Sequence, residues 1–160
     1  MLNEKIITTL ILAPFRSIIQ DREKRSVDQS ESLLFFGCRH PEKDLYFKDE
    51  FGSLRRFNAF SRLEEKKQYV QDVIAENSQL VFDKIMSGAV VLIAGKAQDM
   101  PDQVKEALID AFEKHGQQYG MDRDSGKQLL DVLEEQGRLQ QETWWRLRSR
   151  KSGEKSIHWC

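Results

Sequence analysis

The sequence predicts an α/β fold, in which a parallel sheet is covered by helices on both faces. Four short apolar runs, several of them rich in β-branched residues, have the length of buried strands. A longer polar or helically periodic stretch follows each run, so strands and helices are expected to alternate along the chain. The crossovers that this alternation requires are right-handed and place helices against both faces of a parallel sheet.

The individual elements follow from these two patterns. The first helix is expected to begin at Pro14, because proline suits the first turn of a helix, and Pro101 and Asp102 suit the first turn of the fourth. The expected strands cover residues 5–12, 33–36, 57–60 and 89–93. The expected helices cover residues 14–22, 45–55, 69–86, 99–112 and 124–135.

Length and composition bound the class of protein. A chain of 160 residues is enough for one domain with a single core. Its 25 Lys and Arg nearly balance its 26 Asp and Glu, so no overall field favours nucleic acid or a membrane. Cys38 and Cys160 fit neither a disulfide framework nor a metal site. No apolar run has the length of a membrane span and no signal peptide is evident, so we expect a cytoplasmic protein.

Polar residues follow three of the expected strands. Cys38 and Arg39 come after the second strand, Ser61 and Arg62 after the third, and Gly95 ends the fourth. Ligands of parallel α/β sheets bind beyond the carboxyl ends of the strands. We therefore expect these residues to line one crevice.

Residues 59–71 are the most informative stretch. Ser61, Arg62, Lys67 and Tyr69 place a hydroxyl, a guanidinium, an ammonium and a phenol at an expected strand-to-helix corner. Arginine binds phosphate as a two-pronged donor, lysine adds a point charge, and a phenol ring stacks on an aromatic base. The set suits a phosphorylated sugar carrying a base. A polar helix start with ordinary surface charge also fits, and the residues alone slightly favour it.

The same stretch resembles the segment of the diflavin reductases that holds the 2'-phosphate and adenine of NADPH. In this family, which contains cytochrome P450 reductase, a Ser-Arg pair is followed by Lys, Tyr and Gln at these offsets. Similar residues recur along most of the chain, at 13–16, 36–39, 94–95, 100–101 and 140–144. The resemblance implies a Rossmann-like NADP-binding domain of the ferredoxin–NADP reductase type over residues 1–144.

The resemblance also implies the roles of the residues in this stretch. Ser61, Arg62 and Lys67 would hold the 2'-phosphate, and Tyr69 would stack on the adenine. Gln71 would support the same pocket. Together these contacts would select NADPH over NADH.

Four further residues are implied to bind cofactor. Arg39 lies in the motif at the end of the second strand. Met100 would touch the nicotinamide ribose, although packing at a helix start explains it equally well. Gln103 stands where relatives often carry an acid, and Trp144 would cover a flavin ring. No catalytic side chain and no metal ligand is expected within this chain.

By resemblance, the complete enzyme passes a hydride from NADPH to FAD, and electrons then leave singly through FMN. Ala94 before Gly95, together with the Glu-Thr-Trp ending at 142–144, is closest to the branch of the family that serves cytosolic iron–sulfur cluster assembly. The implied partners are therefore the flavin domains and an electron-accepting protein of that assembly.

Several features depart from the family. Residues 7–11 replace a Gly-rich turn with bulky side chains, which should weaken diphosphate binding at a helix N-terminus. The flavin-binding regions are not present, so the isolated chain is expected not to complete the reaction. Residues 145–160 form a basic tail, expected to be disordered, with an amphipathic or anionic-surface role as the alternative. Together with a shortened connection before Ser61, these departures suggest a variant or truncated form.

The alternative function is a non-catalytic module that binds only nucleotide or a partner.

Overall fold

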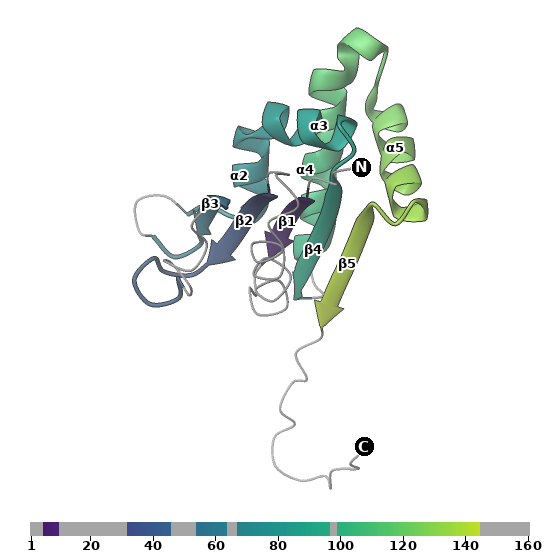
Figure 1. Ribbon diagram of the computed structural model, residues 1–160. Coiled ribbons are helices and arrows are strands. Elements are labelled where there is room, and N and C mark those ends of the chain that lie inside the picture. Colours follow the sequence, from purple (N-terminus) through teal and green to yellow (C-terminus); the bar gives the residue numbers. More distant parts are fainter. Residues whose placement is uncertain (1–4, 10–31, 46–53, 64–66, 97–98, 145–160) are drawn as a thin grey trace, which may run out of the picture.

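The computed structural model describes residues 5–9, 32–45, 54–63, 67–96 and 99–144 of the chain (Figure 1). The helix expected over residues 14–22 lies outside these ranges, as do positions 46–53 of the helix expected over 45–55. The strands are β1 (Lys5–Thr9), β2 (Ser32–Cys38), β3 (Arg55–Phe60), β4 (Val90–Lys96) and β5 (Leu139–Trp144).

The five strands form one parallel sheet in the order β3-β2-β1-β4-β5. The sheet grows from β1 in one direction through β2 and β3, and in the other through β4 and β5 (Figure 1). The order therefore reverses between β1 and β4, which is the topological switch point beside which such sheets bind ligands. The predicted parallel α/β architecture is confirmed.

Within the described residues, four α-helices and one short 3-10 helix accompany the sheet. The helix α4 is central in this layer, because it contacts α2, α3 and α5. The helices are α2 (Val70–Glu76), α3 (Ser78–Met86), α4 (Asp99–Gly116), η1 (Gln117–Tyr119) and α5 (Arg123–Glu135).

The described parts of β2 and β4 are buried on both faces of the sheet. Successive residues of a strand point to opposite faces, and β2 and β4 divide accordingly. Leu33 and Phe35 pack with the helices in the larger core cluster, whereas Leu34 and Phe36 belong to a second cluster with Leu92 and Ala94 of β4. All of these side chains are buried, as a parallel sheet requires.

The predicted helices differ in their bounds from those in the structure, and α4 runs to Gly116 rather than to residue 112. The stretch expected as one helix over 69–86 is broken at Asn77, whose side-chain amide donates to the Val73 carbonyl at 2.8 Å. Asparagine competes in this way with the helical backbone, so α2 ends and α3 begins here. The prediction that a helix reaches residue 55 is wrong, because Arg55 and Arg56 belong to β3.

β3 begins two residues earlier than predicted, because two arginines at its start do not fit the apolar pattern of a buried strand. Each arginine lies over an aromatic ring, Arg55 at 5.2 Å from the Phe57 centroid and Arg56 at 4.8 Å from that of Phe36. The strand β5 was also not predicted, since residues 140–143 are polar and exposed. Its stability comes from the backbone ladder with β4 and from buried Leu139 rather than from an apolar run.

Candidate functional site

Backbone hydrogen bonds join the carboxyl ends of β2 and β3. The Ser61 N–H donates to the Cys38 carbonyl and the Arg62 N–H donates to the Arg39 carbonyl, each at 3.0 Å. The Ser61 hydroxyl also donates to the Cys38 carbonyl at 3.4 Å. The structure therefore brings the backbones of Arg39, Ser61 and Arg62 together at one edge of the sheet. A crevice that these residues share with Gly95 stays a prediction. We call residues 38–39, 61–62 and 67–69 the β2–β3 corner.

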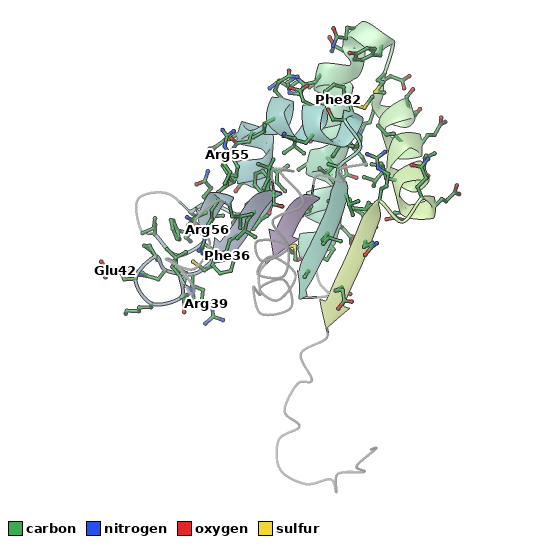
Figure 2. The ribbon with its side chains drawn as sticks, viewed as in Figure 1. Phe36, Arg39, Glu42, Arg55, Arg56 and Phe82 are labelled. Atoms are coloured by element: carbon green, nitrogen blue, oxygen red, sulfur yellow. The ribbon has the colours of Figure 1, made fainter. Side chains whose placement is uncertain are left out.

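The arginines of this corner are open to solvent. Arg39 and Arg62 are exposed, and neither guanidinium is paired with another described residue. Figure 2 shows Arg39 in the loop that follows β2, with Glu42 beyond it. Exposed arginines are available to a phosphate as charge-assisted, two-pronged donors.

The chain returns to this corner before it enters α2. The Gln68 N–H donates to the carbonyl of Phe60, the last residue of β3, at 3.0 Å. Lys67 and Tyr69, on either side of Gln68, therefore lie beside the end of β3. Lys67 is exposed and Tyr69 is 50% exposed. The structure thus places the backbones of Ser61, Arg62, Lys67 and Tyr69 at one corner, as predicted.

Gln71 and Gln103 form a second, separate group. The Gln71 side-chain amide donates to the Gln103 amide oxygen at 2.9 Å, joining α2 to α4. Both line a groove of about 450 Å³ that also carries five carboxylates. The groove is lined by Gln71, Asp72, Ala75, Asp99, Asp102, Gln103, Glu106, Ala107 and Asp110. Carboxylates repel phosphate, so this groove is unsuited to the charged part of a nucleotide.

The two remaining predicted residues, Met100 and Trp144, lie outside the β2–β3 corner. Met100, in the first turn of α4, is partly buried against the larger core cluster, which agrees with a packing role. Trp144 ends β5 and pairs in register with Lys96 of β4. Gly95 lies within β4 rather than after it, paired with Thr143.

Part of the segment that replaces the expected Gly-rich turn is a regular strand. Ile7, Thr8 and Thr9 belong to β1, which pairs with β2 on one side and β4 on the other. Residues 10 and 11 lie outside the described ranges. Central-strand residues hydrogen-bond to both neighbours, so their N–H groups are engaged within the sheet.

Cys38 is a neutral residue of the corner. Burial chiefly raises the pKa of its thiol, nearby Asp44 adds to this rise, and Arg56 opposes it. The thiol donates weakly to the His40 carbonyl at 3.7 Å. Because a thiol, unlike a thiolate, is a poor nucleophile, the raised pKa disfavours a nucleophilic role for Cys38.

Sequence reasoning missed two contributors to this site. Arg56 is half-buried, donates from Nε to Asn58 at 2.7 Å, and has a pKa lowered by burial. Asp72 accepts from the Tyr69 N–H at 2.8 Å. An acid three residues after the N-cap residue is a recognised capping signal, but tyrosine is not a usual capping residue, so the signal was missed.

No described helix is long and apolar enough to cross a membrane. The described residues also contain no group of three or more His, Cys, Asp or Glu that is arranged to hold a metal ion.

A parallel sheet of this strand order, with polar residues gathered beyond its carboxyl ends, defines the class of nucleotide-binding α/β domains. The family model described as the oxidoreductase NAD-binding domain matches residues 12–106, more than half of the chain. The chain belongs to this family.

Curated relatives narrow the family further. The chain is 40% identical over 140 residues to NADPH-dependent diflavin oxidoreductase 1 of Danio rerio, an alignment that covers 83% of this chain and 23% of the relative. The protein of that name from Xenopus laevis is 41% identical over 140 residues, with 83% and 22% covered. NADPH–cytochrome P450 reductase of Dictyostelium discoideum is 31% identical over 142 residues, with 84% and 21% covered.

The chain thus spans less than a quarter of the length of these relatives. Together with the family match, they confirm the resemblance to the NADPH-binding region of the diflavin reductases.

Proposed function

We propose that the chain binds the 2'-phosphoadenosine end of NADPH at the β2–β3 corner. Ser61, Arg62 and Lys67 hold the 2'-phosphate, and Tyr69 stacks on the adenine. The observation that carries this proposal is the closure of the corner, where bonds from Ser61, Arg62 and Gln68 bring the two loop ends together. On one closed loop, a guanidinium supplies two parallel hydrogen-bond donors and an ammonium supplies a point charge, and both suit a phosphate ester.

The other residues would act around this contact. Arg39, tied by its carbonyl to Arg62, adds a second guanidinium beside the phosphate. The Gln71–Gln103 amide pair supports the uncharged base, since amides recognise a base without the repulsion that carboxylates exert on phosphate. Met100 would contact the nicotinamide ribose, and Trp144 would cover a flavin ring.

The nucleotide site would serve a longer electron-transfer protein. NADPH supplies a hydride when bound, and in the complete protein FAD would accept it and FMN would pass the electrons on singly. We assign the NADP-binding domain to residues 1–144 and a basic tail to residues 145–160. The partners would be the flavin domains and, as acceptor, a cytosolic iron–sulfur assembly protein, which implies a cytoplasmic location.

A second candidate is a module that binds nucleotide or a partner without catalysis. The observation that favours it is the regular pairing of Ile7, Thr8 and Thr9 in β1, where the family carries its Gly-rich turn. Backbone N–H groups engaged in a sheet are not available to a diphosphate. This candidate predicts that NADPH binds no more tightly than its 2',5'-ADP fragment.

Binding of 2',5'-ADP to Arg62→Ala tests the proposal. Titration calorimetry should show that the unmutated protein binds the ligand and that the substitution weakens binding by about 1.5–3 kcal/mol, the scale of a hydrogen bond to a charged group. Arg55→Ala is the matched control, because Arg55 is an exposed arginine at the opposite end of the same strand. Failure of the unmutated protein to bind 2',5'-ADP would sink the assignment.

A further inference from the structure

The start of α2 is capped in an unusual way. Tyr69 occupies the N-cap position and makes no capping hydrogen bond through its side chain. Asp72 accepts the Tyr69 N–H from within the first turn, with 2.8 Å between nitrogen and carboxylate oxygen. Serine, threonine, aspartate and asparagine are the residues that normally cap a helix, and tyrosine is not among them.

The helix α5 shows the ordinary arrangement in the same molecule. Asp122 is its N-cap residue, and the Asp122 carboxylate accepts the Ser125 N–H at 2.8 Å. In α2 the carboxylate is three residues further on, and an aromatic ring stands where the capping side chain would be. The arrangement in α2 therefore leaves the cap position open to a residue that serves another purpose.

The backbone around Tyr69 is fixed from both sides. The preceding residue, Gln68, donates its N–H to the Phe60 carbonyl at 3.0 Å and its side-chain amide to Glu76 at 2.8 Å. Asp72 fixes the Tyr69 N–H itself. Tyr69 as a whole nevertheless stays 50% exposed. A fixed backbone with an exposed ring is the arrangement that lowers the entropic cost of stacking a ligand on that ring.

Asp72 has two opposing effects on nucleotide binding, one through its charge and one through its hydrogen bond. Asp72 lies among the carboxylates of the acidic groove, so its charge opposes an approaching phosphate. Its hydrogen bond to Tyr69 acts in the other direction, by holding the stacking residue. A direct contact with the nucleotide phosphates is therefore excluded on electrostatic grounds, and any favourable contribution must pass through Tyr69.

We propose that Asp72 is a positioning residue for nucleotide recognition, which presents Tyr69 to the adenine before the nucleotide arrives. This inference rests on the proposed function, because it requires an adenine at Tyr69. It adds to that function a residue that touches no ligand and that determines how well the base, rather than the phosphate, is bound.

Binding of 2',5'-ADP to Asp72→Ala and Asp72→Asn tests the role by titration calorimetry. Asp72→Ala removes both charge and acceptor and should weaken binding by about threefold to tenfold, the range of one net hydrogen bond. Asp72→Asn keeps an acceptor oxygen and removes the charge, so its affinity should equal or exceed that of the unmutated protein.

A double-mutant cycle with Tyr69→Ala distinguishes positioning from general destabilisation. In the Tyr69→Ala background, Asp72→Ala should cause no further loss of affinity, because the residue through which it acts is gone. Asp122→Ala, which removes the comparable cap of α5, should lower Tm without changing affinity. An equal loss from Asp72→Ala in both backgrounds would overturn the positioning role.

Amide hydrogen exchange of the unmutated protein gives a test that needs no variant. The Tyr69 amide should be protected before 2',5'-ADP is added. An unprotected amide that gains protection only with ligand would overturn the inference even if Asp72→Ala does not fold. Absence of 2',5'-ADP binding by the unmutated protein would instead refute the proposed function, so the two failures are distinguishable.

Discussion

Charged side chains serve different purposes in the α4–α5 layer and in the β2–β3 corner. In the helix layer, Arg123 pairs with Glu106, Asp110 and Glu113, and Lys105 pairs with Glu134. In the corner, the cationic groups of Arg39, Arg62 and Lys67 are exposed and unpaired with any other described residue. The paired charges join two helices at the protein surface, whereas cations that pair with no described residue are available to an anionic ligand.

The two regions also differ in how they are held together, by backbone hydrogen bonds in the corner and by side-chain packing between the helices. The backbone of the corner is tied at Ser61, Arg62 and Gln68 to neighbouring strand ends. The helices instead meet through side chains such as Leu108 and Phe112 of α4 and Leu133 of α5 in the core. A rigid backbone that presents uncommitted side chains is a common design for binding sites, because the fold supplies the position and the ligand supplies the partner.

The largest effect on the helix side is expected from Arg138→Ala. The Arg138 guanidinium donates to the Ile85 carbonyl at 2.5 Å and to the Ala89 carbonyl at 3.1 Å, joining the end of α3 to the start of β5. Loss of these charged hydrogen bonds should lower the free energy of unfolding by about 1.5–3 kcal/mol in urea titrations. Affinity for 2',5'-ADP should not change.

Arg138→Lys is the matched control for that variant. Lysine keeps the charge but lacks the planar fork, so it should recover part of the stability. If Arg138→Ala weakened 2',5'-ADP binding as strongly as Arg62→Ala does, the proposed division between the two regions would be wrong.

Alkylation of Cys38 probes the charge of the corner. The raised pKa keeps the thiol protonated, so Cys38 adds no negative charge beside the arginines. In a Cys160→Ser background, iodoacetamide should react more slowly with the folded protein than with urea-unfolded protein at pH 8. The folded rate should keep rising with pH above the ordinary thiol pKa of about 8.5. An inflection at or below that pKa would show a thiolate in the corner and contradict the picture.

The smallest effect is expected from Arg123→Ala. The ion pairs of Arg123 are exposed, so their loss should lower Tm only slightly, and added salt should reduce the difference. Lys114→Ala, on the same helix layer, is the control. Affinity for 2',5'-ADP should stay the same, and a loss comparable to that of Arg62→Ala would mean that α5 takes part in the site.

Much of the sheet was predictable, for a physical reason. Residues 33–36 of β2 and 91–94 of β4 are buried on both faces, so their side chains are apolar and the pattern is visible in the sequence. β5 was not predictable, because its exposed glutamines and threonine carry no such pattern and backbone pairing with β4 supplies the stability. The break at Asn77 was missed because the apolar stripe continues across it from α2 into α3.

Some features of the candidate site were likewise predictable from the sequence, and others were not. The meeting of Arg39, Ser61 and Arg62 could be predicted, because topology alone brings the carboxyl ends of neighbouring parallel strands together. The Gln71–Gln103 bond and the acid-rich groove could not be predicted, since they depend on how α2 packs against α4. The same holds for Asp72, whose role is visible only once Tyr69 is known to occupy the cap of α2.

The most direct test compares two ligands that differ only in the 2'-phosphate. If the corner binds that group, the unmutated protein should bind 2',5'-ADP at least about tenfold more tightly than adenosine 5'-monophosphate, since one charged hydrogen bond contributes about 1.5 kcal/mol or more. The preference should shrink as salt is added, because the contact is ionic. Equal affinities for the two ligands would contradict the central claim that the β2–β3 corner is a 2'-phosphate site.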